Sequence, residues 1–155
     1  MVLNMAELGW AACAIDAEGT ITHATVRGEN RSTIRVSVFN TDPRFVLKMR
    51  TLFGIGTVTS RVRVGRTGKT ERRSYTWTAS QRQAGRILEQ VLPHLVIKRE
   101  QAELALAIMA TMRNSPGQGK GIGRFVPPES WALRQDLSAR LKVVRDHRPT
   151  LEEVS

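Results

Sequence analysis

The stretch that decides the fold is residues 10–21, which read Trp-Ala-Ala-Cys-Ala-Ile-Asp-Ala-Glu-Gly-Thr-Ile. Residues 7–15 are mostly small or apolar and have good helix propensity, and a glycine then provides the turn out of the helix. A strand is expected from Thr20 onward. The helix would end on Asp16 and Glu18, although a helix C-terminus favours cations. Such clustered carboxylates are typical of a site for a hard cation such as magnesium; the alternative is that they are solvated turn residues.

Small side chains dominate the surface of this helix. They are Ala11, Ala12, Cys13, Ala14 and Ala17. Few bulky groups would then keep another backbone from approaching closely. An ordinary buried helix is one interpretation. The other is a self-contact across a twofold axis, which would place two acidic helix ends side by side, one from each subunit.

The chain has a formal net charge of +10, and the excess lies in one segment. Residues 20–86 contain 14 of the 24 Lys and Arg residues but only 3 of the 14 Asp and Glu residues. A merely solvated surface would carry charges of both signs. An excess of positive charge in one segment is typical of proteins that bind nucleic acid.

The basic segment has the alternation of strands. Residues 32–39 and 57–64 alternate apolar and polar side chains, and residues 72–78 return as a strand with Tyr75 and Trp77 facing inward. Two hairpins are predicted, at 20–39 and 57–78, each with one apolar face. A bulge is also expected within 20–27, because the polar residues there do not all share one face.

The other face of each hairpin carries Arg, Thr and Ser. An antiparallel ribbon of this kind can enter the major groove, where arginine reads guanine and hydroxyls contact bases or phosphates. The residues expected to contact DNA are Thr20, Thr22, Arg27, Arg31, Thr33, Arg35, Ser37, Thr59, Arg61, Arg63, Arg66, Arg72, Ser74 and Thr76.

Three more helices complete the predicted plan. Residues 43–53 form one that Asp42 caps, and residues 81–92 form another that Ser80 caps. A last helix, 131–145, would pack on the body through Leu133, Leu137, Leu141 and Val144. The order helix, hairpin, helix, hairpin, helix is an α+β plan, with one face of the sheet left for a ligand.

Length and composition set the limits of this plan. The 155 residues predict a single domain, with a core at about 7–113 and a C-terminal helical extension at about 127–148. One cysteine excludes an internal disulfide, and no stretch has the length of a membrane span. The expected protein is soluble and has no membrane partner. Arginine outnumbers lysine 19 to 5, as in GC-rich coding, so the cytoplasm or nucleoid of a bacterium or phage-infected cell is expected rather than an organelle.

Two stretches resemble a known family. Residues 11–19, Ala-Ala-Cys-Ala-Ile-Asp-Ala-Glu-Gly, resemble the LAGLIDADG motif of homing endonucleases, with Glu18 in place of the second Asp. Residues 91–102, Val-Leu-Pro-His-Leu-Val-Ile-Lys-Arg-Glu-Gln-Ala, are similar to a second segment of these enzymes, Leu-x-Pro-x-Leu-x-x-Lys followed by a Gln-Ala helix. With the element order between them, the resemblance covers about two-thirds of the chain.

The resemblance implies an αββαββα core with a DNA-binding sheet shaped as a saddle. One motif per chain implies a homodimer, with Ala11, Ala12, Cys13 and Asp16 at its interface. The dimer would bind a long, nearly palindromic DNA site and hydrolyse both strands across the minor groove, leaving short 3′ overhangs. No small-molecule substrate is implied.

The resemblance also implies the catalytic residues. Glu18 and the carbonyl of Ala17 would hold Mg²⁺, with Mn²⁺ as a substitute and Ca²⁺ supporting binding without cleavage. Lys98 would lie near the scissile phosphates, unless it is only a solvent-facing residue at a helix start. Asp42 stands where relatives carry a polar residue that positions water, but its place before Pro43 also explains it as a helix cap.

Two alternatives stay open. A relative that binds DNA or RNA without cutting it, such as an intron maturase or a transcription regulator, would share the fold and the basic face. A basic structural protein of the ribosomal kind would explain the charge, but not an acidic helix end followed by paired hairpins. Metal-dependent cleavage separates these from an endonuclease, whereas salt dependence does not.

Overall fold

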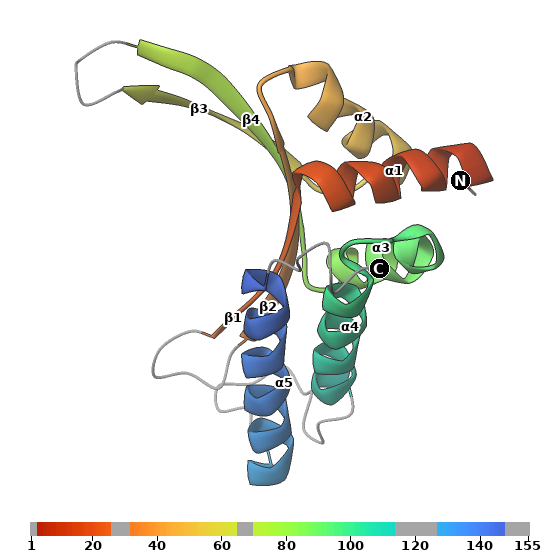
Figure 1. Ribbon diagram of the computed structural model, residues 1–155, viewed down its shortest axis with the longest axis vertical. Helices are drawn as coiled ribbons and strands as arrows, with labels where there is room; N and C mark the ends of the chain where they lie inside the picture. The colour runs from red at the N-terminus through yellow and green to blue at the C-terminus, as the bar shows by residue number, and fades with distance from the viewer. Residues whose placement is uncertain (1–2, 26–31, 65–69, 114–126, 148–155) are drawn as a thin grey trace.

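The computed structural model describes residues 3–25, 32–64, 70–113 and 127–147 of the chain (Figure 1). The elements run in the order α1 (Met5–Glu18), β1 (Gly19–Thr25), β2 (Ser32–Asn40), α2 (Pro43–Phe53), β3 (Thr57–Val64), β4 (Thr70–Ser80), α3 (Arg82–Val91), the 3₁₀ turn η1 (Leu92–His94), α4 (Arg99–Arg113) and α5 (Pro128–Asp146). The predicted α+β order is confirmed. No helix of the described ranges is long and apolar enough to cross a membrane.

The four strands form one antiparallel sheet in the order β1-β2-β4-β3. The two hairpins therefore join along their second strands, where Ser37 of β2 lies opposite Thr78 of β4. Within the second hairpin the register shifts between Val62 and Val64, toward the free end of β3.

The bulge expected in residues 20–27 does not occur in the part of that stretch that the structure describes. β1 pairs with β2 without interruption, from Gly19 opposite Val38 to Thr25 opposite Ser32. Thr25 simply lies on the same face as the core residues, because strict alternation is kept. The turn of this hairpin, with Arg27, lies outside the described residues.

The sheet is curved, and its two faces have different surroundings (Figure 1). Helices α1, α2, α3 and α4 lie on the convex side, and no helix of the described ranges covers the concave side. The outer part of the β3–β4 hairpin projects past the helices.

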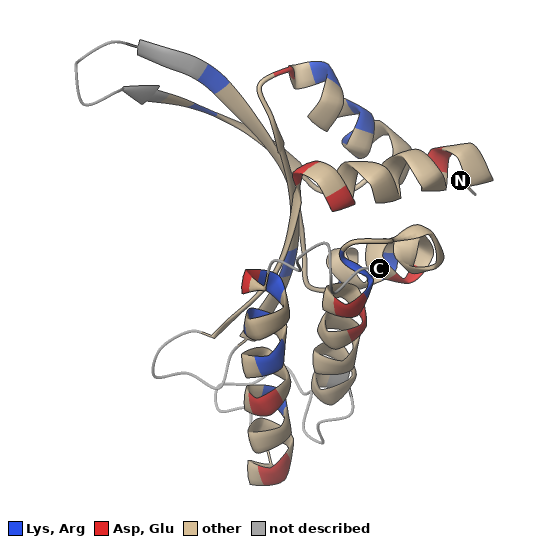
Figure 2. Cartoon of the chain, in the orientation of Figure 1, with Lys and Arg blue, Asp and Glu red and all other residues tan. Residues whose placement is uncertain are grey.

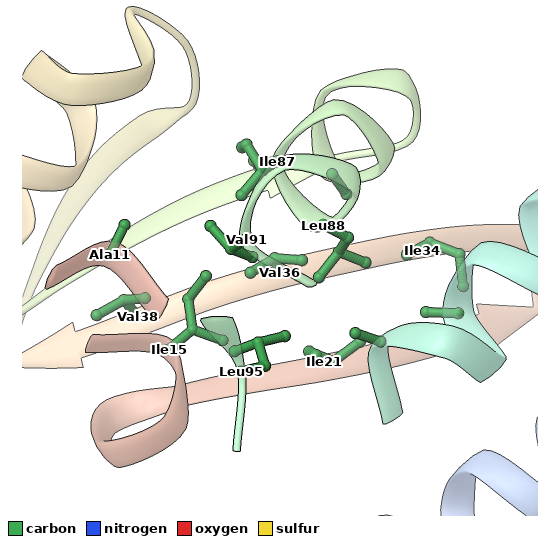
Figure 3. Packing of buried hydrophobic residues seen from close by; sticks show 14 of the residues in the cluster. Ala11, Ile15, Ile21, Ile34, Val36, Val38, Ile87, Leu88, Val91 and Leu95 are labelled. Carbon is green, nitrogen blue, oxygen red and sulfur yellow. The ribbon is translucent and has the colours of Figure 1, made fainter. Parts of the chain in front are cut away.

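The core lies between the convex face and the helices (Figure 3). Ile15 of α1, Val36 of β2 and Leu88 of α3 are all fully buried there. Leu95, which follows η1, is also fully buried and ties the start of α4 to the same cluster. Burying such side chains stabilises the fold by about 1.5–3 kcal/mol each.

Local signals set the ends of α1 and α2. Asn4 and Glu7 form a reciprocal capping box, each side chain accepting a main-chain N–H at 2.9 Å, so α1 begins before residue 7. Asp42 caps α2 as predicted, accepting the main-chain N–H of Arg44 at 2.9 Å. Gly54 ends α2 in the left-handed conformation, with φ of 65°.

The cap predicted for α3 is wrong. Ser80 is the last residue of β4, and the N-cap is Gln81, whose side chain does not bond to the helix. Gln81 bonds to β2 instead, because its amide donates to the carbonyl of Ser32 at 3.0 Å. Strand β2 rather than the local sequence therefore fixes this helix start.

Helix α5 packs on α4 and β1 with most of the predicted face, because Val144 also packs against the core. Leu137 and Leu141 are buried as expected, but Leu133 is 52% exposed. The buried neighbour is Arg134, 3% exposed, which donates from Nε to the Thr111 hydroxyl at 3.0 Å. Its other nitrogens donate to the Thr111 carbonyl at 3.3 Å and to the hydroxyl of Ser32 at 3.5 Å. Polar partners on α4 and β2 therefore decide how α5 is rotated.

Candidate nucleic-acid interface and acidic helix end

One row of the concave face of the sheet is polar from edge to edge. Thr20 lies opposite Ser37, Ser37 opposite Thr78, and Thr78 opposite Thr57, so one row of hydroxyls crosses all four strands. Residues directly opposite in an antiparallel pair share a face. Ser37 and Thr78 hydrogen-bond to each other at 3.1 Å between their hydroxyl oxygens.

Nine of the residues expected to contact DNA have described side chains, and the strand registers place all of them on this face. They are Thr20, Thr22, Thr33, Arg35, Ser37, Thr59, Arg61, Ser74 and Thr76. Arg27, Arg31 and Arg66 lie outside the described residues, as do the side chains of Arg63 and Arg72. We define these nine residues as the recognition face.

The charge of the recognition face has one sign. Arg35 and Arg61 are exposed on it, and none of the described strand side chains is acidic. Figure 2 shows the acidic residues on the helices instead. A polar surface with only positive charge suits the phosphate backbone and the base edges of nucleic acid.

Sequence reasoning missed an aromatic residue on this side of the sheet. Phe39 lies opposite Thr76 and is 46% exposed, in a row that is otherwise polar. The signal was in the alternation, because Val36 and Val38 point into the core and Phe39 must therefore point out. Thr57, Thr78 and Ser80 share the face and were also missed.

The acidic end of α1 lies at the edge of the recognition face, because α1 leads directly into β1. Ala17 and Glu18 are both exposed there. Gly19 ends the helix as expected, in an extended conformation with φ of −94°. The glycine is needed for space, since a Cβ would overlap the Ile15 carbonyl oxygen and lie 2.8 Å from the Ile15 Cα.

Asp16 is engaged within the chain. Its two carboxylate oxygens accept the main-chain N–H groups of Val96 and Lys98, each at 2.8 Å. These bonds fix the segment that follows η1 against the end of α1, and the expected place of Asp16 at a dimer interface stays a prediction. Of the two acidic side chains at this end, Glu18 is the exposed one.

The structure brings Lys98 to the same helix end, and the alternative of a merely solvent-facing residue is wrong. Its Nζ donates to the main-chain carbonyl of Asp16. Burial lowers the pKa of Lys98, while the nearby charges of Asp16 and Glu18 act in the opposite direction and raise it. A half-buried ammonium group therefore lies within the electrostatic reach of both carboxylates.

Asp42 is engaged by Arg44. The two side chains form an ion pair with 2.5 Å between Nη2 and Oδ2, and this contact lowers the pKa of Asp42 to about 2. Its carboxylate also caps α2, and its main-chain N–H donates to Asn40 at 2.8 Å. Within the described part of the chain, these contacts explain Asp42 as a structural residue.

The residues at the end of α1 fit a hard metal ion, but one chain offers few of them. Glu18 and the carbonyl of Ala17 are oxygen donors, the type that Mg²⁺ prefers, and Mg²⁺ takes six ligands. Within the described residues, no group of three or more His, Cys, Asp or Glu side chains could hold a metal. Water, phosphate or a second copy of the chain must supply the remaining ligands.

The small residues of α1 divide between two faces. Ala11 and Ala12 are fully buried in the core of their own chain, so their predicted place at a dimer interface is wrong. The exposed small residues are Cys13 and Ala17, with Gly9 one turn before them and open space beyond its Cα. Another backbone could approach closely along this line.

Comparison with known proteins supports the fold. No family sequence profile matches the chain, and no curated protein matches it in sequence. Solved structures do match. The homing endonuclease I-CvuI in complex with its target has 22% identity and a TM-score of 0.69, over 94% of this chain and 87% of that one.

Two further structures match in the same way. The archaeal intron-encoded homing endonuclease I-Vdi141I complexed with DNA has 12% identity, a TM-score of 0.69 and the same coverage of 94% and 87%. The LAGLIDADG meganuclease I-AabMI bound to uncleaved DNA has 15% identity and a TM-score of 0.58, over 88% of this chain and 44% of that one. The resemblance seen in residues 11–19 and 91–102 is therefore confirmed as a shared fold.

Proposed function

We propose that this chain is a site-specific DNA endonuclease that acts as a homodimer and hydrolyses both strands with the help of a divalent metal ion. The observation that carries the proposal is the contact between Lys98 and the acidic end of α1. Although 82 residues separate them, Lys98 and Asp16 are joined by two hydrogen bonds next to the exposed Glu18. A cation held beside an exposed carboxylate, at the edge of a polar basic face, suits phosphodiester chemistry.

The recognition face would bind duplex DNA, with the hairpins in the major groove. Arg35 and Arg61 would read guanine or hold phosphates, and the threonine and serine hydroxyls would contact bases or phosphates. The similar structures of I-CvuI and I-Vdi141I hold DNA, which supports this proposal.

The acidic end of α1 would be the catalytic site. Glu18 and the carbonyl of Ala17 would hold Mg²⁺, which when bound supplies an activated water and stabilises the departing oxygen. The Lys98 ammonium would stabilise negative charge on the scissile phosphate. Because burial lowers its pKa, Lys98 also gives up a proton more easily than an exposed lysine. Mn²⁺ is expected to substitute for Mg²⁺, and Ca²⁺ to support binding without cleavage.

A second copy would complete the site. The line of half-buried Gly9 and exposed Cys13 and Ala17 would allow two α1 helices to pack closely, so that two Glu18 side chains would meet near the twofold axis. Val96 and Ile97, 83% and 71% exposed, lie beside the same helix end and would be covered in the dimer. The DNA site would be nearly palindromic, and cuts across the minor groove would leave short 3′ overhangs.

The test is to select binding sites from a randomised duplex library in Ca²⁺ and then to exchange Ca²⁺ for Mg²⁺. The expected result is one long, nearly palindromic site that is cut on both strands in Mg²⁺. Glu18→Gln is expected to keep binding and to abolish cleavage, and Lys98→Met to slow cleavage by about 100-fold or more. Glu103→Gln, which removes an exposed carboxylate from α4, is the matched control and should cut normally.

Three other results would each refute a part of the proposal. A site that is bound but never cut would indicate a regulator or maturase and would refute the nuclease proposal. Failure to select any site would refute specific DNA recognition as well. Normal cutting by Glu18→Gln would refute the proposed metal ligand.

A further inference from the structure

Gln81, between β4 and α3, has an uncommon backbone conformation. Its φ is 55° and its ψ is −126°, and among the described residues it is the only one other than glycine with a positive φ. A residue with a Cβ rarely adopts this backbone conformation. The conformation persists only where contacts with the surrounding structure hold it. Such an outlier calls for an explanation in terms of its contacts.

Three contacts tie Gln81 to consecutive residues of β2. Its main-chain N–H donates to the carbonyl of Ile34 at 2.8 Å. Its side-chain Nε2 donates to the carbonyl of Ser32 at 3.0 Å and to the hydroxyl oxygen of Thr33 at 3.1 Å. The unusual backbone conformation therefore places the amide over the end of β2 on which Thr33 lies.

The chemistry of these partners fixes the orientation of the amide. A main-chain carbonyl can only accept, so the group facing Ser32 must be the NH₂ and not the oxygen. The second proton of the same NH₂ then points to Thr33. The Thr33 oxygen consequently accepts a hydrogen bond, and its own proton remains available.

Thr33 differs from Ser37 in that its partner fixes its role. Ser37 and Thr78 bond to each other, and either hydroxyl can be the donor. Thr33 is half-buried, with one lone pair engaged and no acceptor for its proton among the described residues. On a DNA-facing surface it is therefore set to donate to an acceptor.

We infer that Gln81 is a positioning residue that makes Thr33 a hydrogen-bond donor toward one base of the DNA target. This inference rests on the proposed function. In the major groove the acceptors are N7 of purines, O6 of guanine and O4 of thymine, whereas cytosine presents only a donor. Thr33 should accordingly disfavour cytosine at the base it faces, relative to guanine, thymine and adenine.

The decisive variant is Gln81→Glu. A carboxylate only accepts, so at pH 8 it would lose the bond to the Ser32 carbonyl, accept a hydrogen bond from the Thr33 hydroxyl and leave the Thr33 oxygen to accept from the base. The site preference of this variant should move toward cytosine at one position of each half-site. The expected change in relative affinity is about fivefold or more at that position and small elsewhere.

Three further variants make the test specific. Thr33→Val removes the hydroxyl and should flatten the preference at the same position. Gln81→Gly relieves the positive φ and removes the amide, and should also flatten the preference without reversing it. Gln83→Glu, two residues further on and exposed, introduces the same charge and should leave the selected site unchanged.

The readout is the base preference of each variant in the library selection, with a thermal melt to verify folding. A shift in Gln81→Glu at the position that Thr33→Val also affects would support the inference. A uniform loss of affinity with unchanged preference, in both Gln81 variants, would overturn it and leave Gln81 as a brace of the strand end. Failure of the unaltered protein to select any site would overturn the proposed function and, with it, this inference.

Discussion

The Lys98 ammonium donates to the main-chain carbonyl of Asp16, and the Asp16 carboxylate accepts the main-chain N–H of Lys98 at 2.8 Å. This reciprocal pair closes the end of α1 onto the segment before α4. The two neighbouring acidic residues therefore differ in their surroundings. Asp16 accepts hydrogen bonds from the main chain, whereas Glu18 is exposed.

Asp16→Asn should lower the free energy of unfolding. The asparagine oxygen could accept from one of the two N–H groups, but the asparagine NH₂ would face the other, on Val96 or Lys98. The expected loss is about 1–3 kcal/mol, measured by urea denaturation. Glu103→Gln, on the exposed face of α4, removes the same charge and should change the stability by less than about 0.5 kcal/mol. Equal stabilities of the two variants would contradict the internal role of Asp16.

Arg134→Ala should destabilise the protein through α5. The change removes one donor to the Thr111 carbonyl and one to the Ser32 hydroxyl, together with a side chain that is only 3% exposed. We expect a loss of about 2 kcal/mol or more in the free energy of unfolding. Arg140→Ala, on the exposed face of the same helix, is the control and should be nearly neutral. If both variants were neutral, the buried polar contacts would not hold α5.

His23 should make the stability depend on pH. Its Nδ1 lies 2.8 Å from the Ser138 hydroxyl, and its buried Nε2 has no hydrogen-bond partner among the described residues. Burial, with a smaller effect from the charge of Arg134, lowers the pKa of His23 below 6.5. The unfolded chain then takes up a proton that the folded chain resists, so the stabilising contribution is present above pH 6.5 and is lost as the pH falls through the lowered pKa.

This pH dependence can be measured by urea denaturation between pH 7.5 and about 5. His23→Gln should show a smaller loss of stability over this interval than the unaltered protein. His94→Gln, which changes a histidine outside the α5 contact, should keep the full acid sensitivity. Identical slopes for His23→Gln and the unaltered protein would show that His23 is not the group responsible.

Gly54→Ala and Gly56→Ala should differ in cost. Both glycines have positive φ, 65° and 90°, but a Cβ on Gly54 meets open space. On Gly56 it would overlap Nε1 of Trp77, the atom that donates to the Ile55 carbonyl at 3.0 Å. We expect a loss of about 1–2 kcal/mol for Gly54→Ala from backbone strain alone. Gly56→Ala should lose about 2–5 kcal/mol, because strain and overpacking add. Similar midpoints of unfolding for the two variants would contradict this packing.

The sequence was informative wherever the cause of a structure is local. Asp42 followed by Pro43 predicted both the cap and the start of α2, and alternation predicted which strand residues face the core. Alternation would also have placed Phe39 outward. The motif around Glu18 predicted the acidic helix end, because the whole signal lies within nine residues.

Contacts between distant segments could not be predicted in the same way. Gln81 replaces Ser80 as the cap of α3 because its partners are on β2, and no local pattern contains that pairing. Arg134 turns inward in place of Leu133 because a carbonyl and two hydroxyls on other elements satisfy its guanidinium. The burial of Ala11 likewise depends on which side of α1 meets the sheet.

Strict alternation along β2 also has an evolutionary consequence. Ile34 and Val36 are fully buried in the core, while Thr33, Arg35 and Ser37 lie on the opposite face of the sheet. Substitutions at the outward positions therefore leave the core residues in place. If the chain acts as proposed, its descendants can acquire new DNA target sequences through these positions while they keep the same hydrophobic core.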